Sequence, residues 1–129
     1  MRRSAAALVA AALLAACAAT DPGEPCRDRF VERLYFGLAM PGGAVGEDEW
    51  GAFVDAEITP RFPGGLTIIE ARGQWRGADG RLLRESTRVV EIVHDGGAEA
   101  ALGEIVSRYK ARFRQESVLR TSAPARACF

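Results

Sequence analysis

Histidine is almost absent from this 129-residue sequence, which contains only His94. A serine or cysteine triad would depend entirely on that one imidazole, and no Gly-x-Ser-x-Gly motif accompanies it. We interpret His94 as the polar end of a strand. Phosphate-binding and dinucleotide-binding glycine loops are also missing, since Gly42-Gly43 and Gly64-Gly65 are better explained as turns. The residues therefore assign no catalytic group and imply no cofactor.

An excess of charge of one sign is missing as well. The sequence has 17 Lys and Arg against 17 Asp and Glu, with a formal net charge of +0 at pH 7. Interspersed charges at this balance give no electrostatic attraction for nucleic acid, and the aromatic stacking motif of RNA-binding strands is absent. We therefore expect no nucleic-acid partner. The length suits one domain with a modest core.

Long hydrophobic runs are absent beyond residue 16. The one apolar run, residues 5–16, follows Arg2 and Arg3 and is too short to span a bilayer as a stable helix. It ends in Leu14-Ala15-Ala16-Cys17, which resembles the lipobox of bacterial lipoproteins. We therefore predict a lipoprotein signal peptide over residues 1–16. The alternative is an ordinary secretory signal with an incidental cysteine.

Cleavage before Cys17 would leave a lipidated cysteine and linker over residues 17–29 and a single α+β domain over residues 30–129. Each buried methylene of an acyl chain contributes about 0.8 kcal/mol, so two or three chains make release negligible. The predicted partner is thus the membrane, reached through the lipid anchor. The predicted location is the periplasmic side of the cell envelope. Ala18, in place of an aspartate after the anchor, favours the outer membrane over the inner one.

Cysteine is scarce after Cys17, where only Cys26 and Cys128 follow. In an oxidising compartment such a pair predicts a structural disulfide between the two ends of the domain. Two free thiols, or a metal site with His94, are the alternatives. The spacing matches no recognisable zinc motif, so we predict no metal.

The hydrophobic periodicity predicts six elements in the order strand, helix, strand, strand, helix, strand. This order favours a ferredoxin-like βαββαβ sandwich, in which both helices cover one face of a four-stranded antiparallel sheet. The first and last strands are neighbours there, which would bring Cys26 and Cys128 together. The expected strands are residues 33–40, 66–76, 82–94 and 117–122, and the expected helices are residues 47–59 and 98–114.

The sheet face opposite the helices is the candidate site. Arginine beside an amide and a phenol could bind a small polar or anionic ligand, because the guanidinium fork matches planar anions. A solvated set of cross-strand ion pairs, or a homodimer interface, would explain the same residues. Arg61 and Glu116 are interpreted as residues that fix loops. The expected face presents Tyr35, Arg72, Gln74 and Arg76, with Glu or Arg side chains from residues 84–88.

Several stretches resemble a bacterial family of unknown function, numbered 3574, over roughly residues 30–122. They are Phe36-Gly37-Leu38, Trp50-x-x-Phe53, residues 59–67, Gly73-Gln74-Trp75-Arg76, and residues 109–120. The resemblance implies no activity.

Two function classes follow from the sequence. The first is an envelope lipoprotein that serves as a non-catalytic binding or interaction module. The second is a small cofactor-free enzyme of the dimeric ferredoxin-like type, comparable in architecture to monooxygenases, which rests on fold analogy alone.

Overall fold

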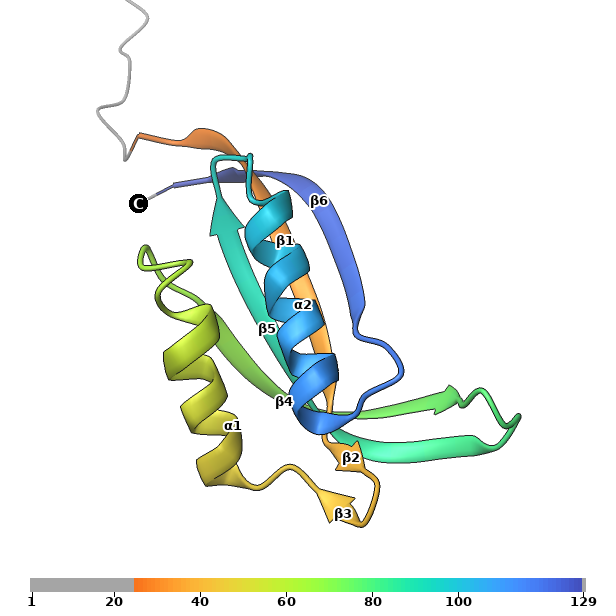
Figure 1. Ribbon diagram of the computed structural model, residues 1–129. Helices are drawn as coiled ribbons and strands as arrows, with labels where there is room; N and C mark the ends of the chain where they lie inside the picture. Colours follow the sequence, from red (N-terminus) through yellow and green to blue (C-terminus); the bar gives the residue numbers. More distant parts are fainter. Residues whose placement is uncertain (1–24, 129) are drawn as a thin grey trace, which may run out of the picture.

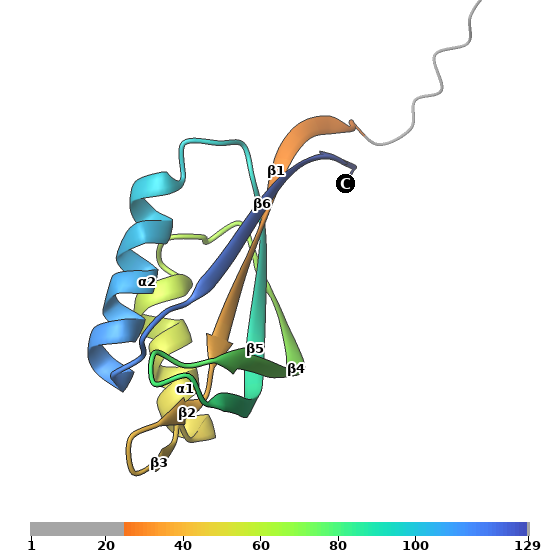
Figure 2. The same cartoon turned by 90° about the vertical axis from the view of Figure 1, so that its right-hand side faces the viewer.

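The computed structural model describes residues 25–128, which form a mixed α/β domain with one large antiparallel sheet and a layer of helices (Figure 1). The sheet has four strands in the order β4-β5-β1-β6. Figure 2 shows both helices on the same side of this sheet. The strands are β1 (Arg27–Gly37), β4 (Thr67–Arg76), β5 (Leu82–His94) and β6 (Leu119–Ala127). The helices are α1 (Glu47–Phe53), its π-helical continuation η1 (Val54–Ile58), and α2 (Glu99–Phe113).

The expected elements are confirmed, with differences at their ends. β5 has the expected bounds, and the expected first helix is α1 followed by η1. β1 begins earlier and β6 ends later than the sequence indicated, because they pair with each other from Arg27–Ala127 to Tyr35–Leu119. β1 thus begins three residues before the expected start of the domain, inside the stretch that we expected to be linker. β1 ends at Gly37, before the expected end of this strand at residue 40. A small hairpin of β2 (Ala39–Met40) and β3 (Gly43–Ala44) was not expected.

The core lies between the helices and one face of the sheet. Leu34 and Phe36 of β1 are both 0% exposed, as the alternation along this strand predicts. Phe36 belongs to an aromatic cluster, and its ring centroid is 4.7 Å from that of Tyr109. Edge-to-face contacts of this kind add to the free energy of burial. The cluster comprises Phe36, Trp50, Phe53, Tyr109 and Phe113.

The outer half of the β4–β5 hairpin, residues 73–85, bends away from the rest of the sheet, and we call it the arm. Figure 1 shows the arm crossing the end of β1 toward the loop between α2 and β6. Its turn is closed by hydrogen bonds from Gly77 N to Arg81 O and from Gly80 N to Gly77 O, each 2.9 Å. Glu116 of the α2–β6 loop accepts a hydrogen bond from Ala78 N at 3.1 Å. The tip of the arm is therefore held against the α2–β6 loop.

The two ends of the described chain are joined by the predicted disulfide between Cys26 and Cys128. Because these residues are 102 positions apart, the bond closes nearly the whole domain into one loop. On the chain-entropy model a loop of that size stabilises the fold by about 4–5 kcal/mol. Cys17 and the expected signal peptide lie outside the described residues. Within residues 25–128, the structure has no helix of the length and apolarity needed to cross a membrane.

Candidate functional site

The expected candidate face is divided between the two sides of the sheet. Tyr35 pairs with Val89, and Val89 pairs with Ile69, so these three side chains share the open face. Arg72 is three positions after Ile69 along β4, so its side chain points to the opposite face, on the helix side. The side chains of β4 alternate as expected. However, the polar ones lie on the helix side, whereas we expected them on the face opposite the helices. These polar side chains are Arg72, Gln74 and Arg76.

The open face is more apolar than the sequence indicated. Ile69 is 46% exposed and Leu119, which pairs with Tyr35, is 60% exposed. The charged pair on this face, Arg33 and Glu91, is internally neutralised by a 2.7 Å contact from Nε to Oε2. The arginines of β4, on which the expected anion site depended, are therefore not on this face.

A pocket of about 200 Å³ lies where the arm passes the end of β1. Three segments enclose it, namely the end of β1, the base of the arm, and the chain between α2 and β6. Of the expected site residues, Tyr35 and Gln74 line the pocket, whereas Arg61, Arg72, Arg76 and Glu116 do not. The lining residues are Tyr35, Gly37, Gly73, Gln74, Trp75, Glu85, Thr87, Gln115, Ser117 and Leu119.

Glu85 is the only residue with a charged side chain among those that line the pocket. Its Oε1 accepts a 2.7 Å hydrogen bond from Trp75 Nε1, and its Oε2 accepts a 2.8 Å hydrogen bond from Ala39 N. Both donors are neutral. Within residues 25–128 no arginine, lysine or histidine forms an ion pair with Glu85. The pocket therefore contains a carboxylate whose charge has no counter-ion.

Gly37 allows the Glu85 carboxylate to lie against the backbone of β1. A Cβ atom at this position would be 2.4 Å from Glu85 Oε1, well inside van der Waals contact. Gly37 also connects the pocket with the core, because its carbonyl oxygen accepts a 2.7 Å hydrogen bond from the hydroxyl of Tyr109. Burial raises the pKa of Tyr109 far above its usual value, and the charge of Glu85 adds to this effect.

Gln115 places a hydrogen-bond acceptor beside the pocket. Its Nε2 donates to Ala39 O at 2.6 Å and to Phe113 O at 3.3 Å, so both amide hydrogens have partners. The remaining polar atom of the side chain, Oε1, can only accept. Gln115 and Ser117 belong to a stretch on which the family resemblance rests, but only the approach of the arm shows that they border a pocket.

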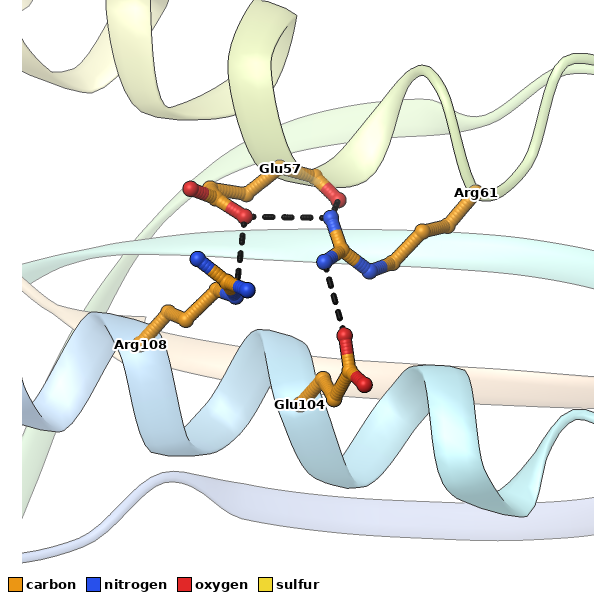
Figure 3. A network of polar contacts seen from close by, with 4 residues as sticks. All are labelled: Glu57, Arg61, Glu104 and Arg108. Atoms are coloured by element: carbon orange, nitrogen blue, oxygen red, sulfur yellow. Dashed lines mark hydrogen bonds and ion pairs between the residues drawn. The ribbon is translucent and has the colours of Figure 1, made fainter.

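Arg61 lies in a network between the end of η1 and α2, away from the pocket (Figure 3). Its Nη1 donates to the carbonyl oxygen of Glu57 at 2.7 Å and to the Glu57 carboxylate at 3.0 Å, while its Nη2 donates to Glu104 at 2.8 Å. Arg108 completes the network with a 3.3 Å contact to Glu57. The hydrogen bond to Glu104 raises the pKa of Arg61 and lowers that of the Glu104 carboxyl group. These contacts support the interpretation that Arg61 fixes the end of a helix.

His94 lies at the opposite end of the sheet, beside a second cavity of about 210 Å³. Its Nδ1 accepts a 3.0 Å hydrogen bond from Gly96 N. Its Nε2 is 3.7 Å from the buried carboxylate of Glu32, without a hydrogen bond. Among the described residues, no group of three or more His, Cys, Asp or Glu side chains is arranged to hold a metal ion.

These features define the class of protein as a small mixed α/β domain with a ligand-sized pocket at the end of an antiparallel sheet. A family model described as "Protein of unknown function (DUF3574)" matches residues 31–129. The chain belongs to this family, as the resemblance indicated. No curated protein matches the sequence.

Solved structures resemble the fold. A phage SAM lyase in complex with S-methyl-5'-thioadenosine has a TM-score of 0.60 at 16% identity, covering 78% of this chain and 90% of that chain. A phage SAM lyase in the apo state has a TM-score of 0.56 at 14% identity, covering 79% of this chain and 90% of that chain. CutA from Synechococcus elongatus PCC7942 has a TM-score of 0.51 at 11% identity, covering 78% and 80%. At these identities the likeness concerns the fold alone.

Proposed function

We propose that this chain is a lipid-anchored protein of the bacterial cell envelope whose domain binds a small ligand, without catalysis, in the pocket between β1, the arm and the α2–β6 loop. The observation that carries this proposal is the pocket itself. Its lining combines aromatic side chains with several polar groups, which is the usual composition of a small-molecule site. Its volume of about 200 Å³ suits a ligand smaller than a typical drug.

The envelope location is supported by two independent features. The lipobox-like sequence before Cys17 supports lipidation at that cysteine, and the Cys26–Cys128 bond suits an oxidising compartment. The bond also ties β6 to the start of β1, which lies within the last residues of the expected linker. Ala18 supports the outer membrane as the destination. The anchored domain would thus remain close to the bilayer surface.

We also propose that the fold is of the ferredoxin-like type. The strand order β4-β5-β1-β6, with every neighbouring pair antiparallel, supports this arrangement. It is the order expected when each of two helices connects strands that are separated by one other strand.

Binding is tested by thermal unfolding of the purified protein against a library of small polar compounds. A ligand that occupies the pocket raises the unfolding temperature by mass action. We expect hits whose effect disappears in Leu119→Lys, which introduces an ammonium group at the rim of the pocket that contains Glu85, and persists in Val93→Lys, an equivalent change elsewhere on the open face. A library without any hit would contradict the proposed function. Membrane attachment is tested by detergent phase partition, which Cys17→Ser should abolish.

A second candidate function is that of a small cofactor-free enzyme that uses the same pocket. The Tyr35 hydroxyl group and the Glu85 carboxylate line one cavity, as an acid and a base would have to, and the fold is similar to that of a SAM lyase. Incubation with SAM, followed by mass spectrometry for S-methyl-5'-thioadenosine, tests this alternative. Formation of that product by the protein, and its loss in Glu85→Gln, would favour the enzyme over the binding module.

A further inference from the structure

The pocket that carries the proposed function has an unusual balance of hydrogen-bonding groups. Two of its side-chain donors are already used, because the indole of Trp75 donates to Glu85 and the amide of Gln115 donates to two carbonyl oxygens. No arginine, lysine or histidine lines it. Acceptors are left available, since each oxygen of Glu85 accepts only one hydrogen bond and Gln115 Oε1 is unused. The pocket therefore keeps unused acceptors beside a negative charge. Its remaining side-chain donors are neutral and belong to Tyr35, Gln74, Thr87 and Ser117.

The charge of the pocket also determines which ligands it can bind. Glu85 has no counter-ion among the described residues, and its neutral partners orient the carboxylate without cancelling its charge. An anionic ligand would be repelled. The expected anion depended on Arg72 and Arg76, neither of which lines the pocket. A positively charged ligand would be attracted to Glu85, because salt screens the interaction between two partly buried charges only weakly.

Two aromatic rings add to this preference. Tyr35 and Trp75 line the same cavity as Glu85, and aromatic faces attract cations. Leu119 supplies apolar surface at the rim, which suits a hydrocarbon portion of the ligand. A carboxylate, unused acceptors and aromatic rings together favour a cation that carries N–H groups over a quaternary cation without them.

We propose that the pocket selects a small protonated amine, with its ammonium group on Glu85 and its hydrocarbon portion against Trp75 and Leu119. This inference rests on the proposed ligand pocket and names the ligand class. The carboxylate would accept N–H hydrogen bonds in addition to those from Trp75 and Ala39. Ligand charge, rather than shape alone, would then determine affinity.

The test uses the Trp75 Nε1–H signal in ¹H–¹⁵N NMR spectra, because this group donates directly to Glu85. The sequence has two tryptophans, so the indole signal that disappears in Trp75→Phe belongs to Trp75. Three probes are titrated at neutral pH: phenethylamine, its neutral analogue 2-phenylethanol, and tetramethylammonium. We expect a saturable shift with phenethylamine, binding at least about tenfold weaker for 2-phenylethanol and tetramethylammonium, and several-fold weakening in high salt.

Glu85→Gln should weaken phenethylamine binding by about tenfold or more, whereas Glu91→Gln, on the same strand but outside the pocket, should leave it unchanged. The wild-type comparison of the charged and neutral probes remains decisive even if Glu85→Gln folds poorly. Equal affinity for phenethylamine and 2-phenylethanol, no shift with phenethylamine, or unchanged binding in Glu85→Gln would each overturn the amine assignment. If library compounds other than amines still bind in the pocket, the proposed function stands and only the ligand class is wrong.

Discussion

Gly37→Ala tests the account of how Glu85 is held. The added Cβ would lie 2.4 Å from Glu85 Oε1 and 2.6 Å from Oε2, so the carboxylate has to move. A glutamate side chain moves easily by itself. Here the movement breaks the hydrogen bonds from Trp75 Nε1 and Ala39 N. Hydrogen bonds to a charged group contribute about 1.5–3 kcal/mol each, and water replaces part of that at this half-exposed position.

We therefore expect Gly37→Ala to lower the free energy of unfolding by about 2–3 kcal/mol in urea titrations. For a domain of this size the unfolding temperature should fall by roughly 10 °C or more. The Trp75 indole signal should also shift, because its acceptor moves. Gly43→Ala is the matched control, since a Cβ at that glycine meets nothing within 4 Å.

The decisive measurement is a double-mutant cycle with Glu85→Ala. Once the carboxylate is gone, the extra methyl group of Gly37→Ala has nothing to displace, and its cost should fall below about 1 kcal/mol. The two single substitutions should thus be strongly non-additive. Additive costs would refute the reasoning, because Gly37 would then be required for its backbone and not for the approach of Glu85.

Three further predictions concern stability. The double substitution Cys26→Ser and Cys128→Ser should lower the free energy of unfolding by about 4–5 kcal/mol in denaturant titrations. Reductant should lower the stability of the wild type only. Equal stability of the wild type and the double variant would contradict the loop-closure account. Above about pH 10 the unfolded state ionises its tyrosines while the raised pKa keeps Tyr109 neutral in the folded state, so wild-type stability should fall with rising pH and Tyr109→Phe should reduce that slope. The hydrogen bond from Arg120 lowers the pKa of the Glu99 carboxyl group. The Arg120–Glu99 pair therefore stabilises the folded state above about pH 4.5, and this stabilisation is lost as the pH falls through the lowered pKa of Glu99. Between about pH 3 and 6, the unfolding temperature should therefore depend less on pH in Glu99→Gln than in the wild type. An unchanged pH dependence would argue against a stabilising pair.

Much of the fold follows from local patterns. The alternation along β1 predicted which residues are buried, and the helical spacing of Trp50 and Phe53 predicted the helix before Pro60. The end-to-end disulfide was also predictable, because two cysteines at the ends of a domain that we predict to be exported have few other uses. The extra length of β1 and β6 was not, since Arg27 to Arg29 and the residues opposite them lack an apolar pattern and are strands only because they pair with each other.

The sequence by itself determined which side chains of β4 share a face, but not which face the helices cover. Ile68 and Ile69 are both apolar and both partly exposed, so this edge strand gives no local signal for its orientation. Only its pairing with β5, and through β5 with Tyr35, placed the arginines on the helix side. The bend of the arm was equally invisible, because it depends on contacts between distant segments. Together with the pairing of Gly37 with Thr87, that bend places Glu85 against β1 and closes a pocket around it.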